Sequence, residues 1–90
     1  MSEEDRPSVF DFPCQFPIKA MGKTDIEFDL LVVDIINQHV NALATDAIKI
    51  RPSKNGKFVS VTITIEAMSQ RQLDTIYQQL NDHPRVLMTL

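Results

Sequence analysis

The sequence predicts a single two-layer α+β sandwich with the element order β-α-β-β-α-β. Three patterns support it: an amphipathic helical pattern over residues 25–41, alternating β-branched residues over 58–65, and a helical apolar stripe over 70–81. Each element has one apolar side, so two helices stacked on one face of a four-stranded antiparallel sheet bury all of them. This is the ferredoxin-like arrangement, with right-handed crossovers and sheet order 4-1-3-2.

The first half of the chain contains one strand and one helix. Residues 16–21 form a short apolar strand closed by Gly22, in which Pro17 is tolerated only near the strand start or at a bulge. Thr24 or Asp25 can cap the helix that follows, and Leu30 falls on its polar side. Its apolar arc consists of Phe28, Leu31, Val32, Ile35, Ile36, Val40 and Leu43.

The second half begins with an antiparallel hairpin. A strand over residues 47–51 ends at Pro52, and the turn over 53–56 contains Asn-Gly, which accepts positive φ. The strand over 58–65 has a β-branched inner side and a mixed outer side. Ser69 and Gln72 form a capping box for the second helix, and residues 86–90 form the last strand.

Length, composition and charge exclude several classes of protein. The chain has 90 residues, 43% of them hydrophobic, and its longest apolar run, residues 30–33, is far below the ~20 residues of a membrane span. Cys14 is the sole cysteine, so no internal disulfide can form. The acidic N-terminus does not resemble a secretory signal. We therefore expect a cytoplasmic protein without a membrane partner.

The negative charge is concentrated near the N-terminus. Of 12 acidic and 9 basic residues, the first eleven positions hold four and one, so the rest of the chain is balanced at eight of each. We expect residues 1–13 to form a flexible acidic arm and residues 14–90 to form the domain. A neutral domain argues against a nucleic-acid partner.

One face of the predicted sheet carries no helix, and this face is the predicted docking surface. Its expected contact residues are Lys49, Arg51, Phe58, Ser60 and Thr62, with Thr64, Lys19 and Leu87 nearby. The cluster of Lys49, Arg51, Lys54 and Lys57 also fits a phosphate-rich ligand. A solvated hairpin with an edge protected by its charges is the favoured interpretation.

The segment Gly22-Lys23-Thr24 lies between a strand and a helix, where a phosphate loop would lie. A Walker A loop would need glycine at position 17, which is Pro17, so that motif is absent. A generic anion site at this loop stays open as an alternative. The favoured interpretation is a turn glycine followed by a helix cap.

No constellation of catalytic or metal-binding residues emerges from the sequence. His39, His83 and Cys14 are the soft ligands, and no two have metal-site spacing. We expect His39 to be a core histidine with a hydrogen-bonded ring, and His83 to lie at the C-terminus of the second helix. Cys14 has no flanking cation that would activate it. We expect no metal, no cofactor and no enzymatic activity.

Several motifs resemble the YbeD-like family of small bacterial proteins over residues 10–90. They are Phe12-Pro13-x-x-Phe16-Pro17-Ile18-Lys19-x-Met21-Gly22, Pro52-Ser53-Lys54-Asn55-Gly56-Lys57-Phe58, Ser60-Val61-Thr62-Ile63-Thr64-Ile65, Tyr77-x-x-Leu80 and Val86-x-Met88-x-Leu90. The resemblance implies a ferredoxin-like fold similar to the ACT domain, a ligand-sensing module. It also implies a suggested regulatory link to lipoate metabolism, and it supplies no catalytic residues.

These observations lead to a small regulatory or interaction module that docks onto a protein, or onto a second copy, through the open sheet face or the edge strands. The alternative is an ACT-like sensor that binds a small metabolite near Gly22–Thr24. An acylphosphatase-like enzyme would need an arginine in that loop, which has Lys23 instead.

Overall fold

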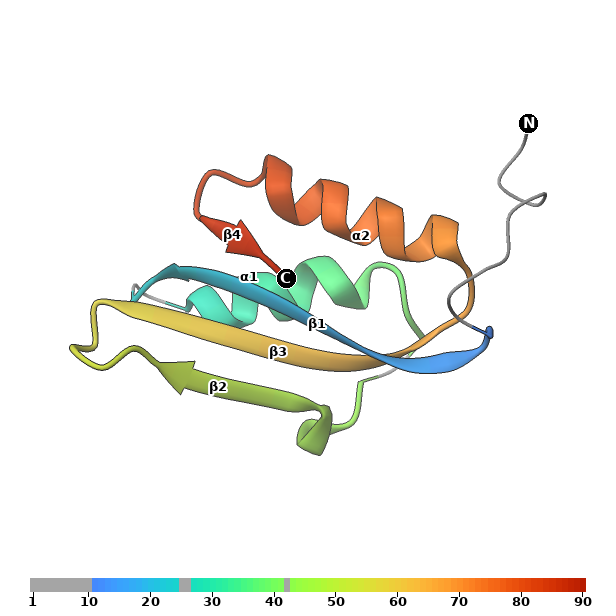
Figure 1. The fold of residues 1–90 in the computed structure, drawn as a ribbon, viewed down its shortest axis with the longest axis horizontal. Coiled ribbons are helices and arrows are strands. Elements are labelled where there is room, and N and C mark those ends of the chain that lie inside the picture. Colours follow the sequence, from blue (N-terminus) through green and yellow to red (C-terminus); the bar gives the residue numbers. More distant parts are fainter. Residues whose placement is uncertain (1–10, 25–26, 42) are drawn as a thin grey trace.

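In a computed structural model of the chain, four strands and two helices form the predicted sandwich (Figure 1). The structure describes residues 11–24, 27–41 and 43–90, so most of the predicted acidic arm lies outside the described residues. The elements are β1 (Cys14–Lys23), α1 (Phe28–Asn37), the short 3-10 helix η2 (Thr45–Ala47), β2 (Ile48–Pro52), β3 (Phe58–Ala67), α2 (Gln70–Asp82) and β4 (Met88–Thr89).

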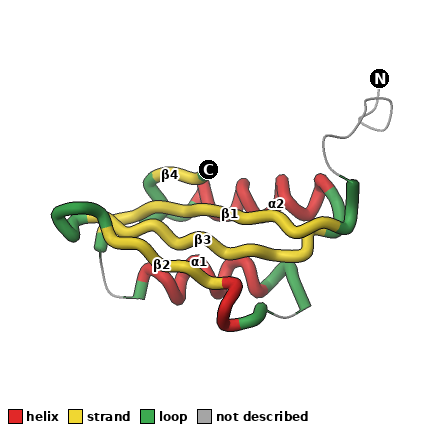
Figure 2. The backbone as a smooth tube through the Cα atoms, turned by 60° about the horizontal axis from the view of Figure 1, so that its bottom comes forward, coloured by secondary structure: helices red, strands yellow, loops and turns green. Residues whose placement is uncertain are grey.

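The strands form one antiparallel sheet in the order β2-β3-β1-β4, which is the predicted order read from the opposite edge. The central strands β1 and β3 pair along their whole length, from Cys14 opposite Ala67 to Lys23 opposite Phe58. Both helices lie on one face of the sheet, and Figure 2 shows them behind the strands. The predicted ferredoxin-like fold is therefore confirmed.

The hydrophobic core lies between the sheet and the helices. On β3, Val61, Ile63 and Ile65 are at most 2% exposed, which confirms the predicted inner side of this strand. The predicted stripe of α2 packs against them, with Leu73, Ile76 and Leu80 fully or almost fully buried. The rest of the buried core consists of Ile18, Ala20, Phe28, Val32, Ile35, Ile36, Ala67 and Val86.

Strand β1 is longer than predicted, and it accommodates Pro17 for a physical reason. Lys19 exchanges two backbone hydrogen bonds with Leu90 on the β4 side of β1. Backbone groups alternate in direction along a strand, so the nitrogen of Pro17 also points to that side. Strand β4 pairs only with Ala20 and Met21, so the N–H that Pro17 lacks would have met no strand partner.

The two helices differ in how well the sequence predicts their ends. Helix α2 begins as predicted, because the Ser69 hydroxyl accepts a hydrogen bond of 3.1 Å from the Gln72 backbone N–H. Helix α1 is shorter than the predicted 25–41, and its cap position is Glu27, at φ 60° and without a side-chain cap. The prediction of Thr24 as the cap was therefore wrong, and Asp25 lies outside the described residues.

Candidate functional site

The sheet face that points away from the helices carries the candidate site, and we call it the open face. Residues paired across antiparallel strands point to the same side of the sheet, so the pairings define this face. Neighbouring pairs place Lys19 and Lys49 on either side of Thr62, and Met21 and Arg51 on either side of Ser60. The open face comprises Gln15, Pro17, Lys19, Met21 and Lys23 of β1, Lys49 and Arg51 of β2, Phe58, Ser60, Thr62, Thr64 and Glu66 of β3, and Met88 of β4.

Positive charge gathers on the open face. Its cations are Lys19, Lys23, Lys49 and Arg51, and among the residues of the four strands, all of them described, Glu66 is the one acid. Two strand spacings of ~4.8 Å place the backbones of Lys19 and Lys49 about 10 Å apart. The balanced charge of the domain is therefore distributed unevenly, with a basic sheet face.

Most of the predicted contact residues are accessible on this face, and one is not. Lys49 and Arg51 are exposed, Phe58 is 40% exposed and Thr62 is half-buried. Ser60 is only 8% exposed, because it lies between two long side chains and its hydroxyl donates to the Arg51 carbonyl at 3.4 Å. The prediction of Ser60 as a surface contact is corrected accordingly.

The predicted turn at residues 53–57 is held by a local hydrogen-bond network. The Ser53 hydroxyl donates to Asn55 Oδ1 at 3.0 Å and accepts from the Phe58 N–H at 3.0 Å. The Lys57 N–H also donates to Asn55 Oδ1, at 3.1 Å, and Gly56 adopts φ 75°. These bonds order the backbone that carries Lys54 and Lys57 beside the open face.

The β4 side of the open face is apolar, and of its residues the sequence analysis named only Leu87. Met88 is 53% exposed opposite Met21, and Leu90 is 63% exposed beside Lys19. Leu87 is 55% exposed, and its N–H donates to the Met21 carbonyl at 2.8 Å. The chain is apolar at every position from 86 to 90 except Thr89, and this run is the sequence signal that could have indicated these side chains.

The segment over residues 22–24, at the end of β1, does not have the geometry of a phosphate-binding loop. Gly22 is buried, and a Cβ atom there would lie 2.5 Å from the Phe28 ring and 2.7 Å from the Arg85 carbonyl oxygen. The Thr24 N–H donates to the Lys57 carbonyl at 2.9 Å, so it is not available to a ligand. Gly22 is therefore a packing glycine inside β1. The favoured interpretation of a turn glycine followed by a helix cap was wrong, because the strand continues through Gly22 and α1 is capped at Glu27.

Lys23 nevertheless lines a small cavity with a second cation. The cavity has a volume of about 200 Å³ and is lined by Lys23, Pro84, Arg85 and Leu87. The guanidinium of Arg85 also lies 6.0 Å from the centre of the Phe28 ring. Sequence reasoning missed Arg85 because it is distant in the chain, although the antiparallel pairing of β1 with β4 indicates this proximity.

The two histidines have structural surroundings. His39 Nε2 donates to Gln79 Oε1 at 2.6 Å, which confirms the predicted hydrogen-bonded ring. The predicted core position is wrong, because His39 is half-buried after the end of α1 and is not among the core residues. His83 caps the C-terminus of α2, and its Nδ1 accepts from the Arg85 N–H at 3.2 Å. Within the described ranges, no three His, Cys, Asp or Glu side chains gather as metal ligands.

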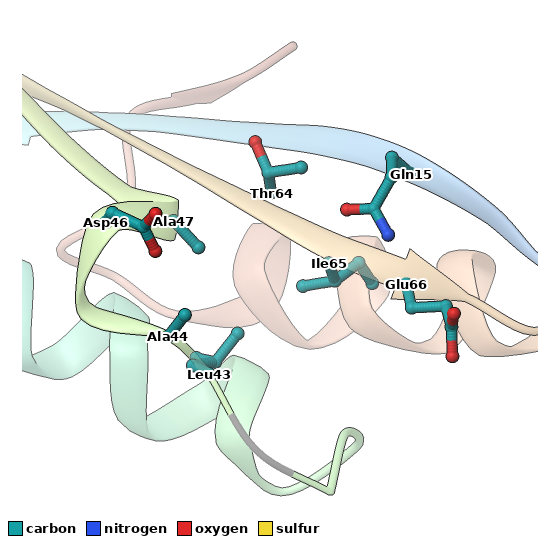
Figure 3. Close-up of a pocket in the computed structure, with 8 residues that line it drawn as sticks. All are labelled: Gln15, Leu43, Ala44, Asp46, Ala47, Thr64, Ile65 and Glu66. Atoms are coloured by element: carbon teal, nitrogen blue, oxygen red, sulfur yellow. The ribbon is translucent and has the colours of Figure 1, made fainter.

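A larger cavity of about 470 Å³ lies where β2 stops short of the end of β3 (Figure 3). Its acids are Asp46 of η2 and Glu66 of β3, and Figure 3 shows them at opposite ends of the lining. Two carboxylates placed in this way do not form the close pair that acid–base catalysis uses. The other residues that line it are Gln15, Leu43, Ala44, Ala47, Thr64 and Ile65.

Comparison with known proteins places this chain in a family. A family model described as a protein of unknown function, DUF493, matches residues 7–90. The chain belongs to the DUF493 family. A UPF0250 protein of Paraburkholderia phytofirmans is 42% identical over 83 residues, which cover 92% of this chain and 93% of that protein. UPF0250 protein NE1487 of Nitrosomonas europaea is 42% identical over the full length of both chains.

Membership of DUF493 confirms the resemblance to the YbeD-like family that the sequence motifs indicated. The solution structure of HP0495 from H. pylori has a TM-score of 0.69 to this chain at 18% identity. The match covers 100% of this chain and 94% of that one, and it shows a shared fold. In the described part of this DUF493 chain, no helix combines the length and the apolar character that crossing a membrane requires.

Proposed function

We propose that this DUF493 chain is a non-enzymatic cytoplasmic module that regulates another protein by docking onto it through the open face. The observation that supports the proposal best is the basic, helix-free face. There Lys49 and Arg51 are exposed beside Phe58, an aromatic ring that is 40% exposed. Aromatic and arginine side chains are enriched in protein interfaces, and a positive patch favours encounters with an acidic partner.

Two further features fit this role. The free thiol of Cys14 suits a reducing compartment. The suggested link of the YbeD-like family to lipoate metabolism makes proteins of that pathway the first partners to test. A second copy of the chain is the other partner that the exposed strand edges allow.

The test is a charge reversal on the open face. The Lys49→Glu/Arg51→Glu variant is compared with Arg71→Glu, a reversal at an exposed position of α2 on the opposite layer. Tagged proteins are incubated with bacterial lysate, and retained proteins are identified by mass spectrometry. We expect one partner to be retained by the wild type and by Arg71→Glu and to be lost by the double variant. Equal retention by all three, or retention of nothing, would contradict docking through this face.

The cavity between Lys23 and Arg85 supports a second candidate function, the binding of a small anionic metabolite. The cavity has a volume of about 200 Å³ and is lined by two cations, and Leu87 and Pro84 add apolar surface. This arrangement suits a carboxylate or phosphate attached to a short apolar group. The proposal retains the predicted position near Gly22–Thr24 but moves the binding groups from the loop amides to side chains.

Thermal unfolding with added ligands separates the two functions. Lipoate, amino acids and phosphorylated metabolites are each added at millimolar concentration to the wild type and to Lys23→Ala. A ligand with micromolar affinity stabilises the folded state by roughly 4 kcal/mol under these conditions, which raises the Tm by several degrees. A shift in the wild type that Lys23→Ala reduces would favour the sensor, and unchanged Tm values throughout would exclude it.

A further inference from the structure

Strand β2 forms one edge of the sheet, and its outer side has no strand partner among the described residues. The Ser53 N–H donates to the Phe58 carbonyl, and the register then turns the backbone groups of Lys49 and Arg51 toward β3. The N–H and C=O of Ile50 therefore point outward. Pro52 has no N–H, so hydrogen bonding along this edge is centred on Ile50.

The side chains of β2 differ sharply between its two sides. Lys49 and Arg51 are exposed on the open face, where they point in the same direction. Ile50 points to the other side and is 51% exposed, since the helix layer does not cover it. A strand added next to β2 would meet two cations on one side and an apolar side chain on the other.

We propose that the outer edge of β2 binds an extended acidic segment of the partner protein as an added strand. This inference rests on the docking function proposed above and names the chemistry of the partner. Side chains alternate along the added strand, so its pattern is acidic–apolar–acidic, with the apolar residue beside Ile50 and the acids beside Lys49 and Arg51. Main-chain hydrogen bonds supply affinity, and the alternating side chains supply specificity.

Charge argues against a second copy as the occupant of this edge. Two β2 strands related by a two-fold axis perpendicular to the sheet keep their open faces on the same side. If the axis passes through Ile50, Lys49 of each copy lies opposite Arg51 of the other. Moving the two-fold axis by one residue, to Lys49 or to Arg51, places Lys49 opposite Lys49 or Arg51 opposite Arg51. Like charges directly opposite each other destabilise strand pairing, whereas carboxylates in those positions stabilise it.

The probe for this proposal is a blocked seven-residue peptide in which glutamate and valine alternate. Its controls are a peptide of the same composition with the glutamates grouped together, and one with lysine in place of glutamate. Binding is followed by the amide NMR signals of ¹⁵N-labelled protein. We expect the alternating peptide to shift the Ile50 amide and to slow its hydrogen exchange about tenfold or more, as a new ladder bond would. Equal binding of the grouped peptide, or shifts confined to residues outside β2, would overturn the proposal.

A backbone variant separates this proposal from open-face docking in general. Ile50→Pro removes the outward N–H and keeps both cations, and an edge strand tolerates proline at such a position. We expect it to weaken peptide and partner binding about fivefold or more. Loss of the partner in Lys49→Glu/Arg51→Glu but not in Ile50→Pro would overturn strand addition and leave open-face docking intact.

Two measurements keep the test decisive. A peptide whose central valine is N-methylated loses the other hydrogen bond of this pair, from the peptide N–H to the Ile50 carbonyl, so it replaces Ile50→Pro if that variant does not fold. Its binding with undiminished affinity would overturn strand addition. Sedimentation of the free protein reports on the other occupant. A monomer is expected, and a dimer that Ile50→Pro abolishes would assign this edge to a second copy.

Discussion

The two faces of strand β3 show how the sheet divides its roles. Ile63 is fully buried against the helices, while Thr62, its neighbour in sequence, is half-buried on the open face between Lys19 and Lys49. Burial of apolar area stabilises the domain on the inner face, at roughly 25 cal/mol per Å². The outer face contributes little of this, so its residues can serve recognition. Residues that stabilise the fold and residues of the proposed docking face are thus separated by one position in the chain.

The largest expected effect is on the inner face. Ile63→Ala removes a fully buried side chain that pairs with Ile18 and Ile48, and we expect a loss of about 3 kcal/mol in the free energy of unfolding. Thr62→Ala, the matched change on the open face, should cost less than about 1 kcal/mol. Urea denaturation measures both. Equal losses would mean that the two faces do not differ in their contribution to stability.

The second prediction concerns the inner face where β1 meets α1. Gly22→Ala places a methyl group against the Phe28 ring and the Arg85 carbonyl, and we expect a loss of about 2 kcal/mol, since the backbone contact cannot move easily. The control is Gly56→Asn, at a position with open space and φ 75°, which asparagine tolerates. It should cost less than about 1 kcal/mol. A neutral Gly22→Ala variant would show that the packing here is loose.

A smaller effect tests how the helix layer holds the β4 edge. The Tyr77 hydroxyl donates to the Leu90 carbonyl at 2.9 Å, and burial raises the pKa of Tyr77 above its usual value of 10.0. The folded state retains this proton to higher pH than the unfolded state does. The resulting stability is complete below pH 10 and is lost as the pH rises through the raised pKa.

The variant that checks this effect is Tyr77→Phe. We expect it to cost about 1 kcal/mol at neutral pH, where one hydrogen bond is lost. The difference from the wild type should shrink as the pH rises above 10. Urea denaturation at pH 7 to 11 measures both quantities, and a difference that stays constant with pH would contradict the role of Tyr77 in alkaline stability.

The smallest expected change in stability belongs to the variant with the largest expected change in binding. Lys49→Glu/Arg51→Glu reverses two exposed charges, and we expect the free energy of unfolding to change by less than about 0.5 kcal/mol. Urea denaturation of this variant beside Arg71→Glu provides the check. A large destabilisation would show that the basic face supports the fold, and the loss of a partner would then not report on docking.

Local patterns predicted a large part of this fold. The alternation on β3 predicted its buried side, and the Ser69–Gln72 pair predicted the start of α2, because both signals act within a few residues. The start of α1 was predicted incorrectly, since the helix begins at Phe28 after Glu27 without a side-chain cap. Packing of an amphipathic face contributes more to helix stability than capping does, so a missing cap is tolerated.

The candidate site was predicted less completely. Lys49, Arg51 and Phe58 are accessible as expected, but Ser60 is buried, because burial depends on the neighbours that the register supplies. Arg85 beside the cavity of Lys23 was missed for the same kind of reason. Contacts between distant segments depend on strand pairing, and strand pairing cannot be predicted from a short stretch of neighbouring residues.

The sequence by itself determined the types of the elements and their apolar sides, since side-chain periodicity and branching act over neighbouring residues. It also determined that the basic residues of the hairpin alternate with isoleucine. Only the tertiary structure decided that Lys19 and Lys49 lie on either side of Thr62, and that the helix layer leaves Ile50 half exposed at the edge. The physical reason is that these features depend on strand register and on the reach of the helices across the sheet, which are set by packing of the whole core.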